Sequence, residues 1–197
     1  LVCGAVIRAR KGWSKLGILI AHAGICLLMA GAFVTFQFST SGHMTLYEKN
    51  QSNEFQSPNE WEIGVAEANT AGSATEYLIR ESDFNDLGPG ETRTFTFENV
   101  PFDMTISGYH ENTMPRPAGH EGAPGRKVVD GYYLESLPSE RESEQNAPGA
   151  YMVLTEKGSD DSYDGILWGH AARPVVVDVN GKSWQMHLRR RRWQLPF

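Results

Sequence analysis

An uninterrupted apolar run from Leu16 to Phe38 constrains the fold of this chain more than any other feature of its sequence. The run has 23 residues with no Asp, Glu, Lys or Arg, and it contains one histidine, His22. A helix needs about 20 apolar residues to cross about 30 Å of hydrocarbon. A buried helix of a soluble protein would carry a polar face, and a secretory signal has a shorter apolar core, of about 7–15 residues. The sequence therefore predicts a transmembrane helix over 16–38.

The basic residues around this run predict its orientation. No Lys or Arg follows the run before Lys49, and four precede it, namely Arg8, Arg10, Lys11 and Lys15. Basic residues stay on the cytoplasmic side of a membrane. We therefore expect residues 39–197 to form an extracytoplasmic domain. Residues 1–15 are interpreted as the end of a preceding apolar segment followed by a basic cytoplasmic loop.

At helical spacing the apolar run has two distinct faces. One face is a stripe of mostly small residues that would let another helix approach closely: Gly17, Ala21, Gly24, Leu28 and Gly31. The opposite face contains His22, Cys26, Met29 and Phe33. Ionisable groups inside membranes are costly and usually functional. His22 is thus either a neutral histidine hydrogen-bonded to a neighbouring helix or a metal or haem ligand. Cys26 and Met29 also carry ligand atoms but are interpreted as packing residues.

Beyond position 38 the chain is acidic. All 24 Asp and Glu residues lie there, together with all but four of the 18 Lys and Arg residues. This balance argues against nucleic acid as a partner, because phosphate would be repelled. Both cysteines, Cys3 and Cys26, precede this part, so it can form no disulfide of its own. We expect the chain to be part of a longer protein, with a β domain that is incomplete at its C-terminus.

Residues 39–197 show the pattern of an all-β domain, sandwich-like or barrel-like. Short alternating runs rich in β-branched and aromatic residues are separated by Gly, Pro, Asn and Asp, from HMTLYE (43–48) to KSWQMHLR (182–189). Asn180-Gly181 favours a type I′ hairpin turn, which would pair Val177 with Trp184 and Val175 with Met186. Two segments are predicted to be loops: the Pro-rich NTMPRPAG (112–119) and the polar LPSERESEQNAPG (137–149).

Four consecutive arginines follow the second strand of that hairpin. Alternation along a strand places Arg190 and Arg192 on one face and Arg189 and Arg191 on the other. They are interpreted either as a solvated strand leaving the core or as a surface that contacts anionic lipid head groups or an acidic partner.

The other histidines give weaker signals. His110-Glu111 and His120-Glu121 flank the Pro-rich loop and could together bind a metal, but they contain no HExxH motif or close ligand triad, so this metal hypothesis is weak. His43, His170 and His187 stand alone and are interpreted as surface or hydrogen-bonded histidines. We predict no catalytic residue in this chain, since we find no Ser-His-Asp arrangement or phosphate-binding glycine loop.

Several segments together resemble one family. They are the helix LGILIAHAGICLLMAGAFVT after a basic loop, the GHMTLYEKN segment, VPFDMTISGYHEN, and the terminal WQMHLRRRRWQLPF. The chain resembles the ResB (CcsB) family of cytochrome c biogenesis proteins over nearly its whole length. The most specific part is the LGxxxAHAG motif of residues 16–24, and the β domain is similar by pattern and order only.

The resemblance implies a role in the haem system of the bacterial inner membrane. With a ResC/CcsA-like membrane partner, such a protein helps to carry haem b across the membrane and present it to the CxxCH thiols of apocytochrome c. Family members are thought to use a transmembrane histidine as a haem ligand, and only His22 matches such a position. The chain would then be a subunit of a cytochrome c haem lyase without a complete active site of its own. The alternative is a non-catalytic, membrane-anchored β module that scaffolds a complex, and an anchored hydrolase is the least supported possibility.

Overall fold

The computed structural model describes residues 16–39, 42–46, 48–68, 75–88, 90–119 and 125–194. By its internal contacts the chain divides into two units, Leu1–Ser41 and Gly42–Phe197. Each unit is described by itself. The expected organisation of residues 1–15 lies outside the described residues.

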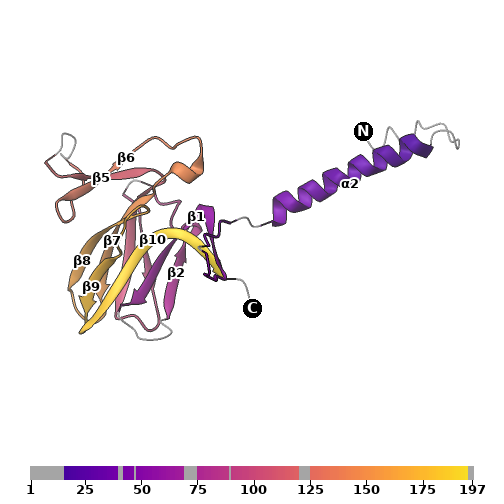
Figure 1. Cartoon of the computed structure of the whole chain (residues 1–197). Coiled ribbons are helices and arrows are strands. Elements are labelled where there is room, and N and C mark those ends of the chain that lie inside the picture. The colour runs from indigo at the N-terminus through magenta and orange to yellow at the C-terminus, as the bar shows by residue number, and fades with distance from the viewer. Residues whose placement is uncertain are drawn as a thin grey trace. The chain divides into compact units, whose positions relative to one another are not determined.

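The first unit contains helix α2, Leu16–Phe38, which coincides with the predicted span (Figure 1). None of its residues is buried, and its large side chains, such as Leu27 and Phe36, are exposed. The helix is long and apolar enough to cross a membrane. A signal sequence near an N-terminus can have the same length and composition. An exposed apolar surface of this size needs lipid or another protein surface to cover it.

The second unit is an all-β domain of antiparallel sheets, as predicted. One sheet has the order β2-β1-β10-β9, a second has the order β3-β4-β7-β8, and β5 pairs with β6 in a separate two-stranded ribbon. The strands are β1 (Glu54–Glu67), β2 (Glu76–Arg80), β3 (Thr92–Thr96), β4 (Phe102–His110), β5 (Thr113–Pro117), β6 (Tyr132–Ser136), β7 (Gly149–Glu156), β8 (Ser162–Trp168), β9 (Val175–Val179) and β10 (Lys182–Gln194). Two short 3₁₀ helices, η2 (Glu81–Asp83) and η3 (Ser143–Gln145), lie in the connections.

The two four-stranded sheets share a single hydrophobic core. Alternate residues of the central strands point into it, as the two-residue period of a strand requires: Trp61, Ile63 and Val65 of β1, Trp184, Met186 and Leu188 of β10, Phe102, Met104 and Ile106 of β4, and Ala150, Met152 and Leu154 of β7. Phe102 of one sheet meets Trp184 of the other edge to face, with ring centroids 5.5 Å apart. This shared core makes the domain a sandwich and not a barrel.

The predicted hairpin is confirmed in its turn and its register. Asn180 and Gly181 both have positive φ angles, 53° and 74°, as a type I′ turn requires. Val177 pairs with Trp184 and Val175 with Met186. The segment 43–48 differs from its prediction, since its described residues form no strand beyond one bridge between His43 and Gln56. Met44 and Leu46 are exposed there, so this segment has no core to face.

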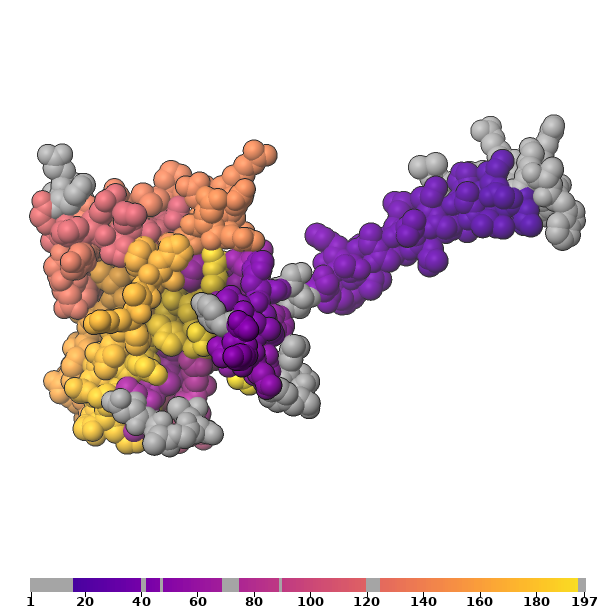
Figure 2. Space-filling view, in the orientation of Figure 1, coloured from indigo at the N-terminus to yellow at the C-terminus, as the bar shows by residue number. Residues whose placement is uncertain are grey.

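The Pro-rich segment 112–119 was predicted to be a loop, and this prediction is wrong. Residues 113–117 form β5, which among the described strands pairs with β6 alone, and Figure 2 shows this ribbon at one end of the domain. Proline fits a strand where no N–H is needed. Pro115 lies opposite Leu134, whose N–H donates instead to the Tyr151 hydroxyl at 2.8 Å. The main-chain hydrogen bonds of the ribbon are made by the alternate pairs, such as Leu137 to Asn112 and Ala118 to Gly131, so Pro115 and Pro117 stand where a missing N–H would face away from β6.

The segment 137–149 also differs from the polar loop that was predicted. Its last four residues, 146–149, are all buried. The Asn146 side chain accepts a hydrogen bond from the Glu140 N–H at 2.8 Å, and the Ala147 C=O accepts one from the Thr113 N–H at 2.8 Å. These bonds fasten the end of the segment to β5.

We predict that Gly181→Ala destabilises the β domain by about 1–2 kcal/mol, because an L-residue pays that penalty in the left-handed region. A new Cβ at this position would meet no atom within 4 Å, so backbone strain is the whole effect. Gly119→Ala is the matched control, since Gly119 also has open space and lacks a positive φ. Urea unfolding followed by tryptophan fluorescence measures both, and an equal effect of the two substitutions would contradict the assigned turn.

Candidate functional site

His22 lies on the exposed surface of α2. Its Nδ1 is 2.7 Å from the carbonyl oxygen of Ile18, one helical turn earlier. In a neutral imidazole that donates a hydrogen bond from Nδ1, the lone pair is on Nε2. Nε2 has no partner among the described residues. A backbone carbonyl often holds one ring nitrogen of a histidine ligand, so this contact is compatible with a ligand role, and the haem-ligand role of His22 stays a prediction.

The small-residue stripe on α2 is open. A Cβ added at Gly17, Gly24 or Gly31 would meet nothing within 4 Å. The predicted packing role of this stripe, which also includes Ala21 and Leu28, therefore stays a prediction. Cys26, on the histidine face, is a free and exposed thiol.

In the β domain, Arg189 is the centre of an ion-pair cluster on the outer face of the β2-β1-β10-β9 sheet. Its Nε donates to Glu62 at 2.9 Å, and its Nη2 donates to Glu76 at 2.7 Å. The His187 Nε2 is 2.7 Å from Arg189 Nη1, and a neutral imidazole accepts this bond. Glu62 is only 2% exposed, so this carboxylate depends on Arg189 for its charge balance.

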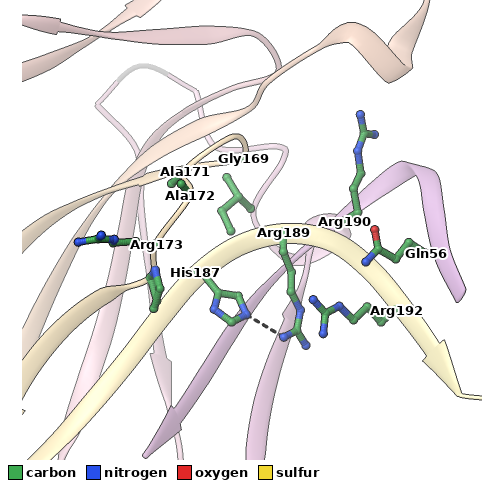
Figure 3. A pocket seen from close by; sticks show the side chains of 11 residues that line it. Gln56, Gly169, Ala171, Ala172, Arg173, His187, Arg189, Arg190 and Arg192 are labelled. Carbon is green, nitrogen blue, oxygen red and sulfur yellow. Dashed lines mark hydrogen bonds between the residues drawn. The ribbon is translucent and has the colours of Figure 1, made fainter. Parts of the chain in front are cut away.

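Arg190 points to the other face of β10, as alternation predicts, and Figure 3 shows it opposite Arg189. Its guanidinium stacks 4.1 Å from the Trp61 ring centroid. It donates to the carbonyl oxygens of Pro58 and, at 2.6 Å, Glu144. Burial lowers the pKa of Arg190 from its usual value. The guanidinium bonds directly only to carbonyl oxygens, and the charges of Glu144 and Glu81 partly balance it by acting against the effect of burial.

The remaining two arginines pair with acidic residues of β1. Arg191 Nη1 lies 2.5 Å from a carboxylate oxygen of Glu60, and Arg192 Nη1 lies 3.8 Å from one of Glu54. The four arginines therefore lie on a strand that remains paired with β1 and do not leave the core as a solvated extension. Contact with head groups or an acidic partner stays a prediction.

A cavity of about 320 Å³ borders the arginines of β10 (Figure 3). Residues 169 and 171–174, between β8 and β9, form one side of it, and β10 forms the other together with Gln56 of β1. Arg173, on the loop side, is exposed and forms no ion pair in the described part of the chain. The cavity is thus basic on both sides.

The described residues contain no group of three His, Cys, Asp or Glu side chains placed to hold a metal ion. His120 and Glu121, one half of the weak metal hypothesis, lie outside the described residues. His170 packs beside Trp61 and Trp168, with ring centroids 6.3 and 5.7 Å away.

Sequence reasoning missed the residues that complete the arginine cluster. Glu62 and Glu76 were assigned no role, His187 was treated as a lone histidine, and Arg173 was not singled out. The period-two pattern of WEIGVAE places Glu62 on the face away from the core. Pairing it with Arg189 required the register of β1 against β10, and these two residues are 127 positions apart.

No protein-family model matches this chain, and no curated protein is similar enough to it to count as a match. The geometry of the described residues therefore has to support any functional conclusion.

We predict that Arg189→Met destabilises the domain by about 3–5 kcal/mol, because it leaves the buried Glu62 carboxylate unpaired. Adding Glu62→Gln should recover much of this loss. Arg192→Met is the matched control on the same strand, and its exposed, longer ion pair should be worth about 0–1 kcal/mol. Denaturant unfolding of the full chain compares the three, and an equal loss for Arg189→Met and Arg192→Met would contradict the assigned role of Arg189.

We also predict that the β domain loses stability as the pH falls through 6.5. Burial, and then the charge of Arg189, lower the pKa of His187 below its usual 6.5. Between the native pKa and 6.5, the unfolded chain binds more protons at this position than the folded chain does, so stability falls as pH is lowered through that window. His187→Gln should flatten this part of the pH profile of thermal unfolding. Identical slopes for the wild type and the variant would contradict the prediction.

Proposed function

We propose that this chain is a ResB-like subunit of a cytochrome c biogenesis complex, anchored by α2 in a bacterial inner membrane with its β domain on the extracytoplasmic side. In this role it helps to carry haem b, as cargo, across the membrane and to present it to apocytochrome c together with a ResC/CcsA-like partner. The observation that carries the proposal is the geometry of His22, whose Nδ1 is bonded to the helix backbone while Nε2 is open.

The two faces of α2 support this role. Haem is apolar over most of its surface, and its iron needs an axial ligand, for which a neutral imidazole costs less in lipid than a charged group does. His22 supplies that imidazole on a helix whose apolar surface is entirely uncovered in the described chain. The opposite stripe of Gly17, Gly24 and Gly31 has room for the close approach of a partner helix.

A second candidate function is a non-catalytic, membrane-anchored module that scaffolds a complex. The cavity beside β10 favours it, because Arg173 and Arg192 are exposed there and can meet an acidic partner. In this case the helix would act only as an anchor, and His22 would hydrogen-bond to a neighbouring helix.

The experiment that separates the two functions is an absorption spectrum of the full-length protein, purified in detergent with its ResC-like partner. We expect a Soret band in the wild type that is lost or shifted in His22→Ala, together with loss of cytochrome c maturation at an unchanged protein level. Met29→Leu, on the same helix face, is the matched control and should leave both readouts unchanged.

Either of two outcomes would overturn the haem role of His22. A Soret band and cytochrome c maturation that the mutation leaves unchanged would assign His22 to helix packing. The complete absence of haem from the wild-type complex would favour the scaffold function.

A further inference from the structure

Strand β10 is longer than the strand that covers one of its two edges. β9 pairs with β10 only between Lys182 and Met186, whereas β10 continues to Gln194. On its other edge, β10 pairs with β1 as far as Gln194. Among the described strands, residues 187–194 are therefore paired on one side only.

The hairpin turn determines which main-chain groups face this open edge. The two residues that flank a two-residue turn form a hydrogen-bonded pair, and such pairs then alternate along the strand. The even-numbered residues from Lys182 to Met186 thus point their N–H and C=O groups toward β9. Ser183 confirms the alternation, since its C=O accepts the Ala68 N–H at 2.7 Å on the β1 side.

Beyond β9 the same alternation leaves three residues with unpaired main-chain groups: Leu188, Arg190 and Arg192. No hydrogen bond in the described part of the chain uses their N–H or C=O groups at this edge. All three residues line the 320 Å³ cavity. An open strand edge beside a cavity is a template for an added strand, which main-chain hydrogen bonds would hold.

The connection between β8 and β9 keeps this edge open. Pro174, just before β9, has no N–H to donate. The preceding residues, 171–173, form no strand and border the cavity on the side away from β10. Among the described strands, the second half of β10 therefore has no neighbouring strand on the β9 side.

The charges around the edge select what can bind there. Arg192 is exposed and has only a 3.8 Å ion pair with Glu54, and Arg173 has no ion pair among the described residues. Arg190 bonds to carbonyl oxygens and is partly balanced by the charges of Glu144 and Glu81. The selection therefore falls to Arg173 and Arg192. A second copy of this edge would place arginines opposite arginines, and like charges facing each other across strands are destabilising. An acidic strand would place carboxylates beside them.

We propose that the open edge of β10 at residues 188–192 binds an extended acidic segment of a partner protein as an added β-strand. The main-chain groups of Leu188, Arg190 and Arg192 supply the hydrogen bonds, and Arg173 and Arg192 select the acidic side chains. This proposal rests on the geometry and the charges of the edge and is independent of whether His22 binds haem.

The test measures binding of synthetic peptides to the full chain in neutral phosphatidylcholine nanodiscs by fluorescence anisotropy. The probe is a capped peptide with alternating Glu and Val residues. Two matched peptides serve as comparisons. In the first, Lys replaces Glu. In the second, alternate backbone nitrogens are methylated, and this change preserves the charge but removes main-chain donors. We expect each change to weaken binding by about tenfold or more, the loss expected for charge-assisted or multiple hydrogen bonds.

Variants of the chain complete the test. The double substitution Arg173→Glu and Arg192→Glu should weaken binding of the acidic peptide by about tenfold or more, since both charges are reversed. Arg141→Glu is the control, because Arg141 is an exposed arginine that does not line the cavity. A thermal melt of each variant checks that the fold is preserved.

Four results would overturn the proposal. Equal binding of the methylated and unmethylated peptides would reduce the site to a simple charge contact. Binding to phosphatidylglycerol vesicles that displaces the peptide from the wild type, and that the double variant loses, would assign the arginines to lipid head groups. Self-association that the double variant abolishes would assign the edge to a second copy. No binding of the acidic peptide would leave the edge without the proposed partner.

Discussion

Strand β10 lies between β9 and β1 and pairs with β1 along almost its whole length, so the last described strand of the domain holds the first one in place. This pairing places Trp184, Met186 and Leu188 in the core beside Ile63 and Val65. It also brings Arg189 onto Glu62 across 127 residues of sequence. Contacts between residues so far apart in the sequence form slowly in folding, because forming them costs the conformational entropy of the long loop between them. The sheet, its core and the basic cavity all depend on that one long-range register.

The arginine run illustrates how one stretch of sequence can serve two purposes. Arg189 balances a buried carboxylate, and Arg190 stacks on Trp61 and holds the β1 bulge and the η3 connection through carbonyl bonds. A planar guanidinium suits both tasks, because it stacks on aromatic rings and donates hydrogen bonds in several fixed directions. The ammonium group of a lysine does neither. Arg192, exposed beside the cavity, keeps most of its capacity for outside contacts. The structural charges thus come first along the strand, and the available charge comes at its end.

Local patterns in the sequence predicted the helix, most of the strands and the β9–β10 hairpin. The hairpin succeeded because Asn180-Gly181 and the alternation of valines fix turn and register within a few residues. The failures have non-local causes. β5 contains two prolines and forms because both stand at positions that donate no hydrogen bond to β6, and residues 146–149 are buried by contacts with a distant strand. No local propensity could reveal those partners.

By itself the sequence determined that the chain has one membrane-compatible helix with a single imidazole on one face and small residues on the other, followed by an acidic all-β domain. Apolar length and side-chain periodicity are properties of contiguous residues, so they need no tertiary information. Only the tertiary structure decided that Glu62 is the partner of Arg189, that His187 belongs to their cluster, and that half of β10 has an open edge beside a basic cavity. These features arise from strands that meet across long stretches of chain, and a sequence pattern specifies each strand without specifying its neighbour.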